Sequence, residues 1–166
     1  GLAMQGILVP HDDTAHEGAS SIPYRFPHIE VRHTHVDAGV PVSFWRSVGH
    51  SQNAFYVESF VDELAYESKK DPYVFRKSLL ADQPRLMAVL DRVAEISKWG
   101  EQLPEGRFHG IAVHGSFKSF AAQVAEISVE NNEVKVHKIF CVIDCGTVVN
   151  PDIVRSQMEG GVIFGL

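Results

Sequence analysis

The sequence is poor in features that define several large classes of protein. Its 166 residues include only two cysteines, Cys141 and Cys145, too few for the disulfide framework of a small secreted domain. It has no run of about 20 apolar residues, the length that a membrane-spanning helix needs. Fifteen basic residues against 21 acidic ones leave a net charge of −6, whereas nucleic-acid binding needs clustered positive charge. We therefore expect neither a nucleic-acid partner nor a membrane span.

Common catalytic and metal-binding motifs are missing as well. There is no Gly-x-Gly-x-x-Gly segment, no phosphate-loop lysine pattern and no Gly-x-Ser-x-Gly. On an extended strand Cys141 and Cys145 would share one face about 13 Å apart, which exceeds disulfide reach. A metal site would need two more ligands, so we interpret both cysteines as small buried apolar residues. His33 and His35 would share one face of a strand, but no third ligand is apparent, and we predict no metal site.

The composition is that of one globular domain. Apolar residues make up 45% and charged residues 22% of the chain, ordinary values for a folded protein with a real core. We treat residues 1–166 as a single, partial domain of the α+β class, with a mixed or antiparallel sheet, a three-helix segment and a C-terminal helix. The expected strands cover residues 6–9, 29–36, 108–116, 121–129 and 134–142, and the expected helices cover 52–68 and begin at Pro72, Pro84 and Pro151.

The segment Trp45-Arg46-Ser47-Val48-Gly49 is a candidate binding site at the start of the first long helix. The planar guanidinium of Arg46 can hold an anionic, oxygen-rich ligand in two directions. The helix that follows adds backbone donors near its N-terminus. The alternative is a surface arginine whose aliphatic stem covers an aromatic residue.

A second candidate lies in the last helix, which Asn150-Pro151 opens through a favoured N-cap and first-turn pair. The amide of Gln157 offers an acceptor and two donors, which suits the edge of a pterin ring. Gly160 and Gly161 lie three and four residues further on, and without Cβ atoms they let a flat ligand approach the backbone. The alternative is a helix that packs tightly on a neighbour, with Gln157 bonded to a backbone group.

The only dense carboxylate group on a helix consists of Glu58, Asp62 and Glu63. Glu58 and Asp62 are spaced i, i+4, so they can bind a cation or act as an acid–base pair. Such groups are more often solvated or paired with a nearby lysine or arginine.

Three stretches in this order resemble the molybdenum hydroxylase family, which includes xanthine dehydrogenase and aldehyde oxidase. They are Trp45–Gly49 with the helix after it, Gly110–Phe117, and the Gln157-Met-Glu-Gly160 segment. The resemblance covers roughly Ile22 to Leu166. Ser47 stands where the family usually has glycine, and Val48 stands where xanthine dehydrogenases carry a bulky aromatic residue. Both departures are similar to the branch of isoquinoline oxidoreductase β subunits and imply a roomier substrate pocket.

The resemblance implies a C-terminal-half fragment of a molybdopterin-binding subunit, inactive by itself. It implies that the whole enzyme hydroxylates N-heteroaromatic compounds or oxidises aldehydes with water. The cofactor would be molybdenum–molybdopterin, in a dinucleotide form, and electrons would leave through a [2Fe-2S] partner subunit. The implied cofactor contacts are Trp45, Arg46, Gly49, Gln157, Gly160 and Gly161, and Val48 is expected to line the substrate pocket.

No residue of this chain is expected to be catalytic, since the family's general-base glutamate lies beyond the Gln157 segment. The partners implied are the remainder of the subunit and the iron–sulfur subunit. The implied compartment is the cytoplasm, or the periplasm after folded export. The alternative is a non-catalytic interaction module that retains the fold without cofactor, with the apolar end Val162–Leu166 as its association surface.

Overall fold

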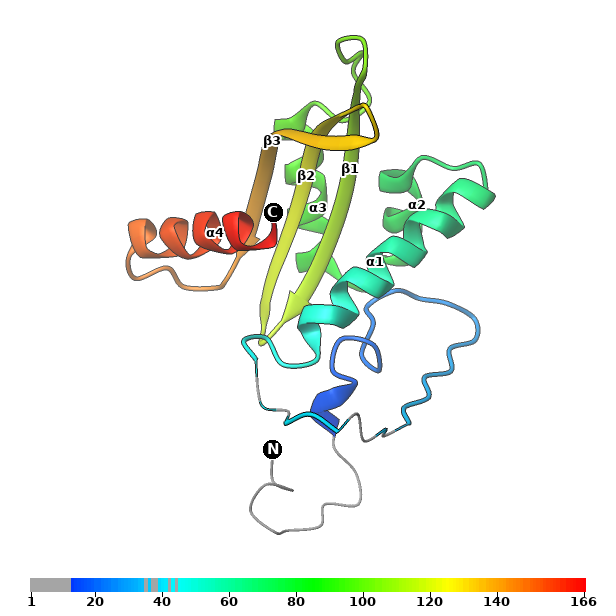
Figure 1. Ribbon diagram of the computed structural model, residues 1–166, viewed down its shortest axis with the longest axis vertical. Coiled ribbons are helices and arrows are strands. Elements are labelled where there is room, and N and C mark those ends of the chain that lie inside the picture. The colour runs from blue at the N-terminus through cyan, green and yellow to red at the C-terminus, as the bar shows by residue number, and fades with distance from the viewer. Residues whose placement is uncertain (1–12, 35, 37–38, 42, 44) are drawn as a thin grey trace.

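Three antiparallel strands form the centre of the molecule (Figure 1). β1 (Arg107–Ser116), β2 (Ser119–Glu130) and β3 (Glu133–Asp144) follow one another along the chain and pair in that order. Asn131 and Asn132 both adopt positive φ angles, which confirms the tight hairpin expected between the last two strands. The computed structural model describes residues 13–34, 36, 39–41, 43 and 45–166.

One face of the sheet is covered by α3 (Pro84–Ser97), and the core lies between the two. The strands contribute Ile111 and Val113 of β1 and Ala122 and Val124 of β2, all buried. These residues alternate along each strand because successive side chains point to opposite faces. The residues of α3 in this core are Leu86, Val89, Leu90, Val93 and Ala94.

Two further helices lie beside β1 (Figure 1). α1 (His50–Glu67) and α2 (Pro72–Leu79) match the first two expected helices to within a few residues. Asp71 accepts a hydrogen bond from the Val74 amide at 3.0 Å and so caps α2, as an N-cap aspartate before proline predicts.

The fourth helix, α4 (Pro151–Gly165), lies beside β3 at the other edge of the sheet (Figure 1). The Asn150 side chain accepts from the amides of Asp152 and Ile153, which confirms the expected cap. No residue of α4 is buried. The predicted α+β fold, with an antiparallel sheet, three helices and a C-terminal helix, is confirmed.

The strand expected over residues 29–36 is wrong. Residues 29–34 and 36 adopt no regular secondary structure, and all of them are exposed regardless of their parity. An alternating sequence forms a strand only where a sheet edge accepts it. The edge of β1 does not, because the Glu58 carboxylate accepts the outward-facing amide of Val113 at 2.8 Å. The short strand expected at residues 6–9 lies outside the described residues, as does His35.

Candidate functional site

The Trp45–Gly49 segment forms a tight turn directly before α1. Ser47 and Val48 have φ angles of 66° and 48°, a left-handed conformation that is rare for a β-branched residue. Gly49 is buried because the backbone of residues 14–17 runs against it. A Cβ on Gly49 would lie 2.5 Å from the Thr14 carbonyl oxygen. The turn is therefore held in one shape, and it leaves the Arg46 side chain exposed.

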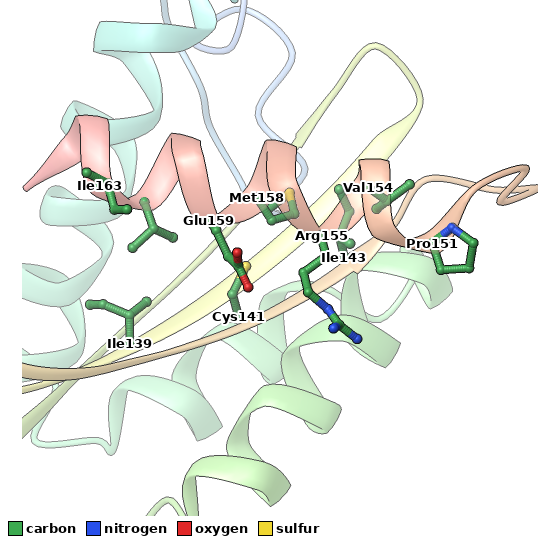
Figure 2. Close-up of a pocket in the computed structure, with 10 residues that line it drawn as sticks. Ile139, Cys141, Ile143, Pro151, Val154, Arg155, Met158, Glu159 and Ile163 are labelled. Atoms are coloured by element: carbon green, nitrogen blue, oxygen red, sulfur yellow. The ribbon is translucent and has the colours of Figure 1, made fainter.

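The helix α4 presents two different sides. Pro151, Val154, Met158 and Val162 point toward β3 and line a hollow with three of its residues (Figure 2). Gln157, Gly160, Gly161 and Phe164 follow the spacing i, i+3, i+4, i+7 and share another side of the helix. All four of these residues are exposed. Gln157 is thus not used to pack α4 against the sheet.

The turn before α1 and the outer side of α4 meet at a ring contact. The rings of Trp45 and Phe164 lie 6.0 Å apart between centroids, with an angle of 31° between their planes. Phe164 lies two turns from Gln157 on the same side of α4, about 10 Å along the helix axis. The structure therefore brings the two predicted segments, more than 100 residues apart in sequence, to one region of the surface.

The residues in this region suit a flat, anionic cofactor. Cβ atoms built on Gly160 and Gly161 would meet no heavy atom within 4 Å, so the backbone of α4 is approachable there. Among the described residues, no ion pair occupies the guanidinium of Arg46, and no group of three potential metal ligands occurs. The cofactor contacts expected of Trp45, Arg46, Gly49, Gln157, Gly160 and Gly161, and the pocket role of Val48, stay predictions.

The carboxylate group on α1 forms a buried polar network rather than a cation site. Arg76 of α2, which is fully buried, donates from Nε to Glu58 at 3.0 Å and from Nη1 to Asp62 at 2.6 Å. The Tyr24 hydroxyl donates to the other Glu58 oxygen at 2.6 Å, and the Val113 amide completes the set. This is the arginine pairing that the sequence left open for Glu58 and Asp62.

Burial dominates the electrostatics of this network. Desolvation raises the pKa of Glu58, although Arg76 opposes the shift, and desolvation together with Glu58 raises the pKa of Tyr24. Burial by itself lowers the pKa of Arg76, but Glu58 and Asp62 reverse the effect and raise it. Every polar atom of Glu58 has a partner, so the network ties α1 to α2 and β1 and leaves no group free for acid–base chemistry.

A histidine pair that the sequence did not reveal lies next to the turn. His50 is the first residue of α1, and its Nδ1 lies 2.9 Å from Nε2 of His114 on β1. Burial, and then the neighbouring His50, lower the pKa of His114 to about 4. Both rings are therefore neutral near pH 7, with one nitrogen donating and the other accepting. No local signal predicts this pair, because 64 residues separate its members.

The fold and these two converging segments define a small α+β domain with a surface suited to a pterin-type cofactor. Residues 89–166 match the molybdopterin cofactor-binding domain family. The chain belongs to the molybdenum hydroxylase family, the group of xanthine dehydrogenase and aldehyde oxidase.

Three curated proteins are similar to the chain. The beta subunit of isoquinoline 1-oxidoreductase from Brevundimonas diminuta is 37% identical over 132 residues, covering 76% of this chain and 17% of the relative. The second of the nicotinate dehydrogenase subunits, B, from Pseudomonas putida is 33% identical over 160 residues, covering 85% and 13%. The membrane-bound aldehyde dehydrogenase [pyrroloquinoline-quinone] of Gluconacetobacter polyoxogenes is 32% identical over 142 residues, covering 73% and 18%.

The chain spans less than a fifth of the length of each of these relatives. No solved structure matches the chain significantly. Within the described part of the chain, no helix is both long enough and apolar enough to traverse a bilayer.

Proposed function

We propose that this chain is part of the molybdopterin-binding subunit of an oxidoreductase that hydroxylates N-heteroaromatic compounds or oxidises aldehydes. Two of the similar proteins are named for isoquinoline and nicotinate, both nitrogen-containing aromatic rings, and a third is named for aldehydes. The observation that carries the proposal is the contact between Trp45 and Phe164, because it joins the Arg46 turn to the side of α4 that presents Gln157.

In this proposal the residues of the chain bind and orient the cofactor. The exposed guanidinium of Arg46 offers paired donors to anionic oxygens, and its fixed turn limits the directions in which they point. The Gln157 amide pairs with a donor–acceptor edge, while Gly160 and Gly161 allow a flat ring to lie against α4. Val48, half-buried beside Arg46, lines the approach of the substrate.

The molybdenum cofactor, when bound, supplies the two-electron oxidation of the substrate. The proposal includes the dinucleotide form of the cofactor, the general-base glutamate outside these 166 residues and the [2Fe-2S] partner subunit. It also includes the expectation that the 166 residues alone are inactive.

The test is the metal content of the complete gene product, co-expressed with its neighbouring genes. We expect molybdenum in near-stoichiometric amount, and a several-fold lower content in Arg46→Ala and Gln157→Ala. The matched controls are Arg32→Ala, an exposed arginine away from the turn, and Ser156→Ala, beside Gln157 on α4. A complete product that holds no molybdenum, or that holds pyrroloquinoline quinone in its place, would contradict the proposal and favour the non-catalytic module or another cofactor class.

A further inference from the structure

The face of the sheet turned away from α3 has the composition of a protein interior. Nine residues of the three strands point to this side, as the strand register and the alternation of side chains require. We call them the open face: Gly110, Ala112, His114, Ala121, Gln123, Ala125, Ile139, Cys141 and Ile143. None of the nine is Asp, Glu, Lys or Arg, and the two polar side chains that form pairs do so within the chain, Gln123 with Cys141 and His114 with His50.

A solvated face on an antiparallel sheet normally carries alternating polar and charged side chains. The charged residues of β2 and β3 gather instead toward the hairpin, as Glu130, Glu133, Lys135 and Lys138 illustrate. A sheet that is apolar on both sides is stable when a layer covers each side. In the described residues α3 supplies one layer, and no helix supplies the second.

Helices flank the open face without covering it. At the β1 edge, Ala54, Phe55 and Ser59 of α1 border a hollow of about 410 Å³ over the small residues of β1 and β2. At the β3 edge, Val154, Met158 and Val162 of α4 border a second hollow of about 590 Å³ (Figure 2). The two hollows lie on either side of β2, so together they form one channel between α1 and α4.

The shape of the channel indicates what fills it. Its floor over β1 and β2 consists of glycine and alanine apart from Gln123 and His114, so a backbone can approach closely there. Helices pack on sheets as a layer about 10 Å away, and an aliphatic stripe would meet Ile139 and Ile143 on the β3 side. The matching occupant is a helix with one uncharged, apolar side.

We propose that a helix of the same subunit, from outside these 166 residues, packs on the open face as its second layer. The inference rests on the proposed function in so far as that function assigns the chain to a longer subunit. Relatives of which the chain spans 17% and 13% hold several times as many residues as this chain, enough to supply such a layer.

The first test labels Cys141, at the centre of the open face, in the complete subunit expressed without molybdate and without its partner subunit. N-ethylmaleimide modification is followed by peptide mass analysis. We expect Cys141 to react more than about tenfold more slowly than in the unfolded protein, already in this cofactor-free, isolated state. Fast labelling of Cys141 under these conditions would overturn the proposal.

Other occupants give different results in the same experiment. Protection that appears only with molybdate indicates the cofactor, and protection that appears only with the iron–sulfur subunit indicates that partner. Protection that rises with protein concentration indicates a second copy. Each of these three outcomes contradicts an intramolecular helix.

A substitution gives an independent measurement. In the complete subunit, Ala112→Lys places a charge in the channel and should reduce the soluble yield at least several-fold. Val134→Lys, at an exposed position near the hairpin of the same sheet, is the matched control and should not reduce it. Equal yields would overturn the proposal. Molybdenum content, measured separately, tells a failure of this inference from a failure of the proposed function.

Discussion

Arg85 of α3 and Asp144 at the end of β3 form a two-pronged ion pair. Nε and Nη2 of Arg85 donate to the two carboxylate oxygens at 2.7 and 2.6 Å, and the guanidinium stacks 4.5 Å from the ring centroid of Phe120. Asp144 also accepts the Gly146 amide at 3.0 Å, in the turn that leads to α4. Hydrogen bonding to Arg85 lowers the pKa of Asp144 to about 2, so the pair persists through the physiological pH range.

We predict that this pair positions α4 and contributes little to stability. Because both side chains are partly exposed, Arg85→Ala and Asp144→Asn should leave the melting temperature nearly unchanged. In the complete enzyme they should lower molybdenum content several-fold, since α4 carries Gln157. Arg92→Ala, which removes an exposed ion pair with Glu95 on the same helix, should change neither quantity. A fall in melting temperature without loss of metal would show that the pair is only structural.

The buried pair of Arg76 and Glu58 should behave in the opposite way. Arg76→Met leaves the Glu58 carboxylate buried without its cation, and we expect a loss of about 3–5 kcal/mol in the free energy of unfolding. Asp62→Asn should cost less than about 1 kcal/mol, because Asp62 is nearly half exposed. Denaturant titration measures both. The double variant Glu58→Gln, Arg76→Met should recover part of the loss, and no recovery would argue against direct coupling.

The histidine pair predicts acid sensitivity. The pKa of His114 falls to about 4 on folding, from an ordinary value near 6.5, so the folded state binds fewer protons than the unfolded state. The stabilisation is complete above about pH 6.5 and is lost as the pH falls toward 4, by an amount on the order of 2 kcal/mol.

The measurement is the free energy of unfolding at several pH values between 4 and 7, for the wild type and for His114→Asn. The variant should show a shallower decline toward acid pH. The raised pKa of Glu58 has the opposite effect on stability, but it is present in both proteins and cancels in the comparison. Parallel curves for the two proteins would contradict the role assigned to His114.

Two substitutions in the turn before α1 should have opposite effects. Gly49→Ala forces a Cβ against the Thr14 carbonyl oxygen and should destabilise by more than about 1 kcal/mol. Val48→Gly relieves a β-branched residue at a φ of 48° and should stabilise by roughly 0.5–1 kcal/mol. Thermal melting of the two variants beside the wild type measures this. If Val48→Gly destabilises, the valine side chain contributes more through packing than its backbone conformation costs.

Local sequence determined most elements of this fold. Asp71-Pro72 and Asn150-Pro151 begin helices because the cap side chain and the fixed proline φ act within three residues. The Asn131-Asn132 turn and its flanking alternation similarly predicted a hairpin. These signals need no distant partner, and they placed Trp45–Gly49 and Gln157 at the start of one helix and on one side of another.

Only the tertiary structure decided which distant residues meet. The alternation over residues 29–36 did not become a strand, because Glu58 already accepts the edge amide of β1. The buried arginine, the histidine pair and the Trp45–Phe164 contact join residues 18, 64 and more than 100 positions apart. Their formation depends on how helices pack on the sheet, a free energy shared among many side chains that no short stretch of sequence contains.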